Sequence, residues 1–160
     1  SSESFEKKYN SDLANDFGNL VSRVSTLIKN NFDEEIPKSN LVDSDLSSNF
    51  QKIVLKEQLD NLEIDKVIND IMAFIRSINV FMEQNEPWKL VKSDKVQAGN
   101  ILYHCAESLR LAAVMLSPVM PLKTKDILDI LGTNDVELVW GKLKSGSKIS
   151  TSEPIFPRIS

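Results

Sequence analysis

Three polar side chains lie one helical turn apart near the start of the chain: Asn15, Asn19 and Arg23, within the stretch NDFGNLVSR. In an α-helix each step of four residues turns the side chain by only about 40°, so the three form one row along the helix. An asparagine amide presents a donor and an acceptor together, and an arginine guanidinium presents a planar set of donors. Such groups can read the edges of nucleic-acid bases. The alternative is an ordinary solvent-exposed helix face.

The composition of this helix favours the first interpretation. Asparagine is a mediocre helix former, and Gly18 inside the same stretch costs up to about 1 kcal/mol relative to alanine. A helix face selected only for solubility would use Glu, Lys and Ala. The apolar residues Phe17, Leu20 and Val24 lie well over about 100° away around the helix, so the polar row faces outward.

Trp88 is a second candidate binding residue. Pro87 disfavours helical geometry at the residue before it and has no N–H to give, so Glu86-Pro87 must end the preceding helix and Trp88 follows a forced turn. Asn79 and Glu83 lie one turn apart on that preceding helix and lead up to the ring. Unpaired RNA bases are recognised by this combination of stacking and edge hydrogen bonds. The alternative is a tryptophan that only fills the core.

The apolar pattern predicts an all-α helix bundle over about residues 5–131, followed by an extended C-terminal tail over about residues 132–160. We expect the tail to be held to the bundle by Trp140, Ile155 and Phe156. The long helix that begins near Leu62 is apolar on more than one stripe and should be central. The expected helices are residues 5–30, a helix capped by Asp43 or Ser44 that contains Leu46, Phe50, Ile53, Val54 and Leu55, and then residues 62–86, 94–116 and 124–131, the last ended by Gly132.

Length and composition limit the classes of function. With 160 residues, of which 41% are hydrophobic, the chain suits one domain, residues 1–160. A net charge of −4 argues against broad binding of nucleic acid through phosphates alone, although it leaves open a local, shaped RNA contact. No apolar run approaches the roughly 20 residues that cross a bilayer, so we expect no membrane partner. The single cysteine cannot form an internal disulfide.

Nothing in the sequence indicates a catalytic or metal site. His104 and Cys105 are adjacent in a predicted helix, and one His with one Cys cannot complete a zinc site. We therefore expect both in or near the core. No Ser/His/Asp set and no phosphate-binding glycine loop is visible. The expectation is that this chain has no catalytic residue, no metal and no cofactor of its own.

Four segments, in this order along the whole chain, resemble the C-terminal anticodon-binding domain of methionyl-tRNA synthetases, which are class I enzymes. They are YNSDLANDFGNLVSR (residues 9–23), NEPWKL (85–90), LRLAAVMLSPVMP (109–121) and EPIFPRIS (153–160). The first and last are specific for this family. The middle two are shared more loosely with its class I relatives, including those for leucine, isoleucine and valine.

The resemblance implies a helix bundle that reads the CAU anticodon of tRNA-Met. By position, Asn15, Asn19 and Arg23 would hydrogen-bond the bases and backbone of the anticodon. Trp88 would stack beneath its first base, cytosine, with Pro87 setting the angle of the ring. Asn79 would be a further partner at the same site, and Glu83 falls where bacterial members often have aspartate.

The resemblance also implies a parent enzyme whose catalytic domain is absent from this chain. That part would use ATP and magnesium to activate methionine and would then transfer it to tRNA. The partners implied are the anticodon stem-loop of tRNA-Met and the enzyme's own catalytic domain, while the oligomeric state is open. The composition, rich in lysine and asparagine, is compatible with a mitochondrial or a bacterial type of enzyme, so we expect the mitochondrial matrix or the cytoplasm.

Two other functions stay open at this point. The chain could be the anticodon-binding domain of a related class I synthetase. It could also be an all-α protein-interaction module in which the Asn/Arg row and Trp88 form a hot spot, since tryptophan and arginine are enriched in such spots. A protein hot spot should be rimmed by exposed aliphatic residues, whereas an anticodon site should be polar around one ring.

Overall fold

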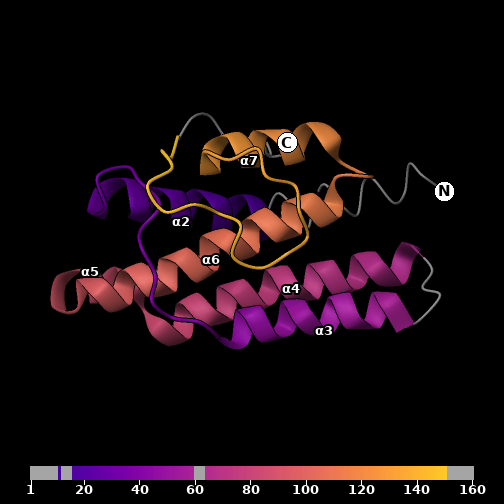
Figure 1. Ribbon diagram of the computed structural model, residues 1–160, viewed down its shortest axis with the longest axis horizontal. Coiled ribbons are helices and arrows are strands. Elements are labelled where there is room, and N and C mark those ends of the chain that lie inside the picture. The colour runs from indigo at the N-terminus through magenta and orange to yellow at the C-terminus, as the bar shows by residue number, and fades with distance from the viewer. Residues whose placement is uncertain (1–10, 12–15, 60–63, 151–160) are drawn as a thin grey trace.

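The computed structural model describes residue 11 and residues 16–59 and 64–150, and in this part of the chain the regular structure is helical (Figure 1). An isolated bridge between Glu35 and Lys148 is the β-type pairing in these residues. The all-α fold class predicted from the sequence is confirmed. The helices are α2 (Gly18–Asn31), α3 (Asp45–Leu59), α4 (Ile64–Asn85), α5 (Pro87–Ser93), α6 (Lys95–Leu116) and α7 (Pro121–Leu131).

Helix α6 is the centre of the bundle. It contacts α2, α3, α4, α5 and α7, and its side chains are buried on every side from Ala98 to Val114. Figure 1 shows α3 and α4 on one side of α6, and α2 and α7 on the other. The prediction that the helix of residues 62–86 is central was wrong, because α4 keeps an exposed polar stripe that includes Asn79 and Glu83.

Small residues let other segments come close to α6 on all sides. A Cβ added at Gly99 would lie 3.3 Å from a ring carbon of Phe32 and 3.4 Å from the carbonyl oxygen of Lys38. Alanines at positions 106, 112 and 113 are also completely buried. An interior helix with short side chains can therefore be covered from several directions at once.

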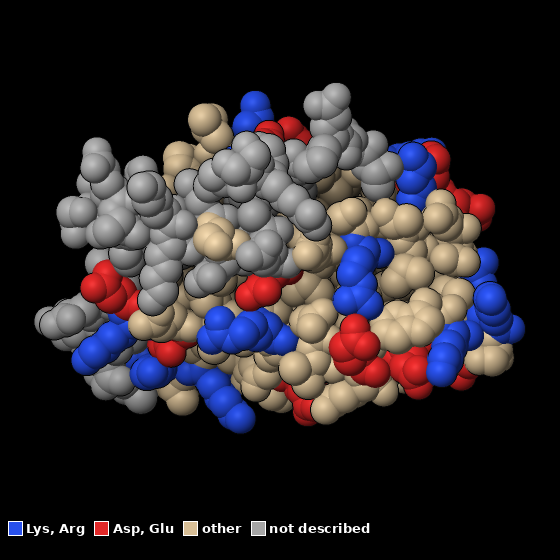
Figure 2. All heavy atoms as spheres, turned by 180° about the vertical axis from the view of Figure 1, so that it is seen from behind, with Lys and Arg blue, Asp and Glu red and all other residues tan. Residues whose placement is uncertain are grey.

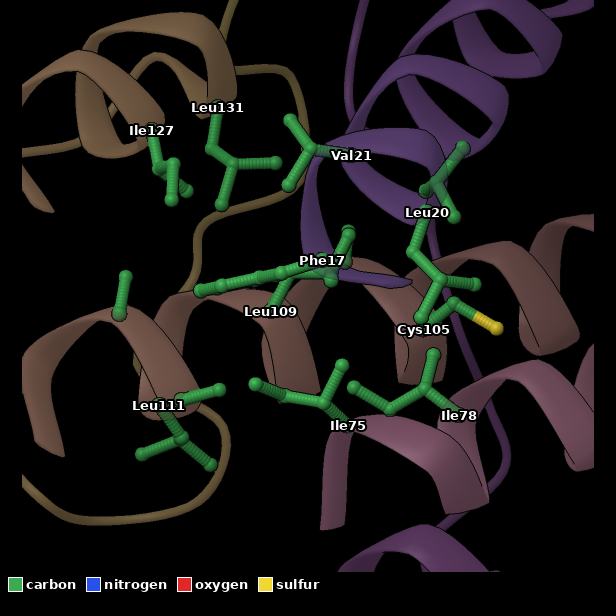
Figure 3. Packing of buried hydrophobic residues seen from close by; sticks show 14 of the residues in the cluster. Phe17, Leu20, Val21, Ile75, Ile78, Cys105, Leu109, Leu111, Ile127 and Leu131 are labelled. Atoms are coloured by element: carbon green, nitrogen blue, oxygen red, sulfur yellow. The ribbon is translucent and has the colours of Figure 1, made fainter. Parts of the chain in front are cut away.

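The apolar stripe of α2 packs where its periodicity predicted. Phe17, Leu20 and Val24 are at most 2% exposed. In Figure 3 the side chains of Phe17 and Leu20 lie among residues of α4, α6 and α7, including Ile75, Leu109 and Leu131. The polar row on the same helix must therefore face outward.

Helix α3 begins with the predicted serine cap. The Ser44 hydroxyl oxygen accepts hydrogen bonds from the backbone N–H groups of Leu46 and Ser47, at 3.2 and 3.4 Å. Leu46 and Phe50 are buried, but Leu55 is 56% exposed, so its inclusion in the buried stripe was wrong. Leu55 is two positions from Ile53, which places it on the far side of the helix from the α4 contact.

A buried ion pair on α6 holds the segment after α7. The side chains of Arg110 and Glu107 are both 0% exposed and face each other. Arg110 donates hydrogen bonds to the carbonyl oxygens of Asp135, Glu137 and Val139, each at 2.9 Å. Glu107 accepts from the backbone N–H groups of Gly141 and Lys142. Residues 135–142 therefore supply the polar partners that this pair needs in order to be buried.

The last described residues pack back on the bundle. Trp140 is half-buried against the rings of Phe50 and His104, and Leu143 and Ile149 are buried, although the sequence analysis did not single out the latter two. The two other predicted anchors, Ile155 and Phe156, lie outside the described residues. The assignment of residues 1–160 to a single domain stays a prediction.

Gly132 ends α7 as predicted, with a left-handed backbone at φ 71°. An added Cβ would come within 2.2 Å of the Lys148 carbonyl oxygen. The glycine is therefore required both by its backbone conformation and by the close approach of the returning chain.

We expect Arg110→Met to lower the free energy of unfolding by about 3–5 kcal/mol, because it leaves the Glu107 carboxylate buried without its cation. Urea unfolding measures this, and cleavage by a protease should appear within residues 135–142. Lys142→Met, which removes an exposed cation from the same segment, is the control and should change stability little. Equal stability of the two variants would contradict the structural role of the pair.

His104 should make stability dependent on pH. In the neutral ring, Nε2 donates to the Leu41 carbonyl oxygen at 2.8 Å and Nδ1 accepts from the Ser44 hydroxyl at 2.6 Å. Burial lowers the pKa of His104 below its ordinary value near 6.5, and this effect outweighs the Leu41 hydrogen bond and the nearby Asp43 and Glu107. The unfolded chain therefore binds the proton more readily than the folded chain. The contribution of His104 to the free energy of unfolding is fully present above about pH 6.5 and is lost as the pH is lowered.

His104→Gln should remove this part of the pH dependence. We expect the free energy of unfolding of the unmodified chain to fall more steeply between about pH 7.5 and 5.5 than that of the variant. Denaturant unfolding at several pH values measures both slopes. Parallel slopes would show that His104 has the same pKa in the folded and the unfolded chain.

Candidate nucleic-acid interface

Polar residues from two helices meet beside Trp88. The Arg23 guanidinium on α2 donates from Nη1 to the Asn79 side-chain oxygen and from Nη2 to the Glu83 carboxylate on α4, both at 3.2 Å. Its Cζ lies 5.5 Å from the centre of the Trp88 ring. We call Arg23, Asn79, Glu83 and Trp88 the Arg23 cluster. The sequence analysis proposed each of these positions, and the structure brings them into contact.

The connection between α4 and α5 places the tryptophan. Helix α4 ends at Asn85, Glu86 adopts a left-handed backbone with φ 48° and ψ 57°, and Pro87 is the first residue of α5. The predicted end of α4 at Glu86-Pro87 is therefore confirmed. Pro87 is buried, which fixes the start of α5 against the bundle. The sequence analysis expected only a turn here and missed α5, although a proline at the first position of a helix is a recognised signal.

The Trp88 side chain is neither fully buried nor fully exposed. The ring is half-buried and packs against the apolar core, while Arg23 lies over its face. A ring held in this way has its orientation set by packing and keeps part of its surface accessible. It is thus suited to stacking against a flat partner.

A hollow of about 560 Å³ lies between α2 and α4 next to the cluster. Asn19 lines it together with Arg23 and Asn79, so the polar row of α2 and the polar stripe of α4 share one concave surface. Asn15 lies outside the described residues. The lining residues are Asp16, Asn19, Leu20, Ser22, Arg23, Arg76, Asn79 and Val80.

The electrostatics of the cluster are those of an exposed site. The side chains of Arg23 and Glu83 are 41% and 55% exposed, so their ion pair contributes at most about 1 kcal/mol to stability. On the face shown in Figure 2, Lys and Arg side chains are interspersed with Asp and Glu side chains. Local geometry rather than a broad charged surface distinguishes this site.

The three lysines that follow Trp88 differ in their surroundings. Lys89 pairs with Glu86 at 2.8 Å, and its hydrogen bond to that carboxylate raises the pKa of Lys89. Lys95 lies over the ring of Phe32, with 5.4 Å from its Nζ to the ring centre. Lys92 is exposed near the end of α5. Two of the three therefore already contact protein groups.

The His/Cys pair lies in the core as expected. Cys105 is completely buried, and burial raises the pKa of its thiol. Within residues 16–59 and 64–150, no three His, Cys, Asp or Glu side chains come together in a way that could hold a metal ion. In the same residues, no helix is both long and apolar enough to cross a membrane.

Residues 35–160 match the family described as the anticodon binding domain of methionyl tRNA ligase. The chain belongs to this family. This result decides between the methionine family and its class I relatives, which the sequence analysis had left open. The match begins after α2, so it includes Asn79, Pro87 and Trp88 but does not extend over the polar row of α2.

Curated methionine–tRNA ligases align over nearly the whole chain. The enzyme of Caldanaerobacter subterraneus subsp. tengcongensis is 35% identical over 171 residues, covering 99% of this chain and 27% of that protein. That of Clostridium acetobutylicum is 38% identical over 168 residues, covering 98% and 26%. The chain thus spans about a quarter of the length of these two relatives.

Solved structures of the same family share the fold. The apo form of Mycobacterium tuberculosis methionyl-tRNA synthetase matches with a TM-score of 0.84 and 26% identity, over 100% of this chain and 35% of that chain. The complex of the same enzyme with methionyl-adenylate matches with a TM-score of 0.83 and 26% identity, over 98% and 33%.

Arg23→Ala should uncover the Trp88 ring without unfolding the domain. We expect acrylamide quenching of Trp88 fluorescence to increase, measured in a Trp140→Phe background, because the guanidinium no longer covers the ring. Stability should fall by no more than about 1 kcal/mol, since the ion pair is exposed. Unchanged or decreased quenching would show that Arg23 does not cover the ring in solution.

Proposed function

We propose that this chain binds the anticodon loop of tRNA-Met and reads its CAU triplet as part of a methionyl-tRNA synthetase. The observation that carries the proposal is the Arg23 cluster, in which hydrogen-bonding side chains from α2 and α4 stand beside a half-buried tryptophan from α5. Stacking and edge hydrogen bonding are the two requirements for recognition of an unpaired RNA base. Membership of the anticodon-binding family supports the assignment.

The geometry suits the edge of a cytosine. Because the Asn79 side-chain oxygen accepts from Arg23, the amide orientation is set and its NH₂ group is left to donate to a base. Cytosine offers two acceptors and one amino donor along its edge. Arg23 and Asn79 can serve the acceptors while the base stacks on the part of the Trp88 ring that stays accessible, and Pro87 positions that ring.

The remaining residues of the proposed site act on neighbouring groups. Asn19 lines the hollow from α2, and Asn15 would extend the row by one turn. Both would hydrogen-bond the bases or the backbone of the loop. Glu83 holds the Arg23 guanidinium in position through its ion pair.

The surroundings favour RNA over a protein partner. A protein hot spot should be rimmed by exposed aliphatic side chains. Six of the eight residues that line the hollow are instead of polar or charged types, and Val80 is the exposed aliphatic member at 51% exposure.

In the longer enzyme, we propose that a catalytic domain outside this chain uses ATP and magnesium to activate methionine and transfers it to the tRNA. This chain would then contact two partners, the anticodon stem-loop and that catalytic domain. A location in the mitochondrial matrix or the cytoplasm stays a prediction, and the oligomeric state is open.

The test is binding of an RNA hairpin with a CAU loop at fixed, moderate salt, followed by Trp88 fluorescence in a Trp140→Phe background. We expect the CAU hairpin to quench Trp88, and replacement of the cytosine to cost about 1–3 kcal/mol of binding free energy. Trp88→Ala and Asn19→Ala should each remove most of the preference, because the first removes the ring that holds the base in place and the second removes an amide that can hydrogen-bond its edge.

Asn30→Ala is the matched control for Asn19→Ala, since Asn30 is an exposed asparagine near the other end of α2. It should leave both affinity and base preference unchanged. Equal binding of all hairpins by the unmodified chain would exclude anticodon reading. A preference that survives Trp88→Ala would exclude the stacking role of the ring.

A further inference from the structure

The hollow between α2 and α4 contains a cation that the Arg23 cluster does not use. Arg76 lies on α4 one turn before Asn79, is exposed, and lines the hollow together with Asn19 and Asn79. Among the residues that the structure describes, its guanidinium forms no hydrogen bond, ion pair or ring contact. The sequence analysis did not single it out.

Arg76 and Arg23 therefore differ in what they can offer a ligand. Arg23 is already held by Asn79, Glu83 and Trp88. The hollow also contains one carboxylate, Asp16, but within the described part of the chain Asp16 forms no ion pair with Arg76. Within the described residues, Arg76 thus keeps its full set of donors at the wall of the hollow.

This combination of charge and shape suits a phosphate. A guanidinium can bind two oxygens of one phosphate through parallel hydrogen bonds. The hollow of about 560 Å³ lies within the usual range for small-ligand sites, about 300–1,000 Å³, which is enough for one nucleotide. An RNA strand that places a base on Trp88 must also carry its negatively charged backbone past the adjoining surface.

We propose that Arg76 is a further RNA-contacting residue of this site and binds a backbone phosphate of the nucleotide that enters the hollow between α2 and α4. The inference rests on the proposed function, since it names the group that one more residue of the same site recognises. Arg76 supplies affinity that does not depend on the base. Arg23, Asn79 and Trp88 supply the discrimination between bases.

The test compares Arg76→Gln, Arg76→Lys and the control Lys125→Gln, which removes an exposed cation from α7. Binding of the CAU hairpin and of a hairpin with the cytosine replaced is measured at several salt concentrations. Circular dichroism and thermal unfolding check that each variant folds like the unmodified chain.

We expect Arg76→Gln to weaken both hairpins by the same factor, about tenfold, and to reduce the salt dependence of log K by about 0.7, the value for one phosphate contact in single-stranded RNA. Arg76→Lys should keep the salt dependence and lose only part of the affinity, because it keeps the charge but not the paired donors. Lys125→Gln should bind like the unmodified chain.

Two results would overturn the inference while leaving the proposed function intact: full affinity of Arg76→Gln, or a loss confined to the CAU hairpin, which would make Arg76 a base-reading residue. If the unmodified chain bound both hairpins equally and Arg76→Gln still reduced the salt dependence, the proposal of anticodon reading would be wrong. The proposed phosphate contact would stand. If the unmodified chain bound neither hairpin, both the proposed function and the inference about Arg76 would be wrong.

Discussion

The buried ion pair between Arg110 and Glu107 is the constraint on which the rest of the structure depends. Both side chains are 0% exposed, and two charges can be held there only if every donor and acceptor has a partner. Those partners are backbone groups of residues 135–142, so this segment must lie against α6 for the pair to be buried. Helix α6 is also the element against which α2, α4 and α5 pack. The position of the Arg23 cluster follows from that packing.

The candidate site is built differently from the core. Its ion pair is exposed and contributes little to folding, whereas the position of its ring is fixed by the left-handed Glu86 and the buried Pro87. Changes to the side chains of the cluster can therefore alter recognition while the fold persists. Changes at the α4–α5 connection would move the ring itself.

Sequence reasoning identified the features that are local. The apolar stripe of α2, the Ser44 cap and the Gly132 terminus depend on neighbouring residues, and the polar row and Trp88 stood out by residue type and spacing. It failed where contacts between residues far apart in the sequence determine which side chains are buried. Arg110 and Glu107 look like solvent-exposed charges until the returning chain is placed on them, which is why α6 was not recognised as the central helix. Arg76 could not be distinguished from any other exposed arginine without the hollow.

The mixed charges on the surface have a kinetic consequence. The chain carries a net charge of −4, and on the face in Figure 2 Lys and Arg are interspersed with Asp and Glu, so long-range attraction to a polyanion is weak. Electrostatic steering speeds encounter in strongly basic proteins, but here it can contribute little. For a chain that binds tRNA, encounter rates would differ little between one tRNA and another. Selection would then depend on how long each complex lasts, and hence on the few contacts made after the loop has reached the ring.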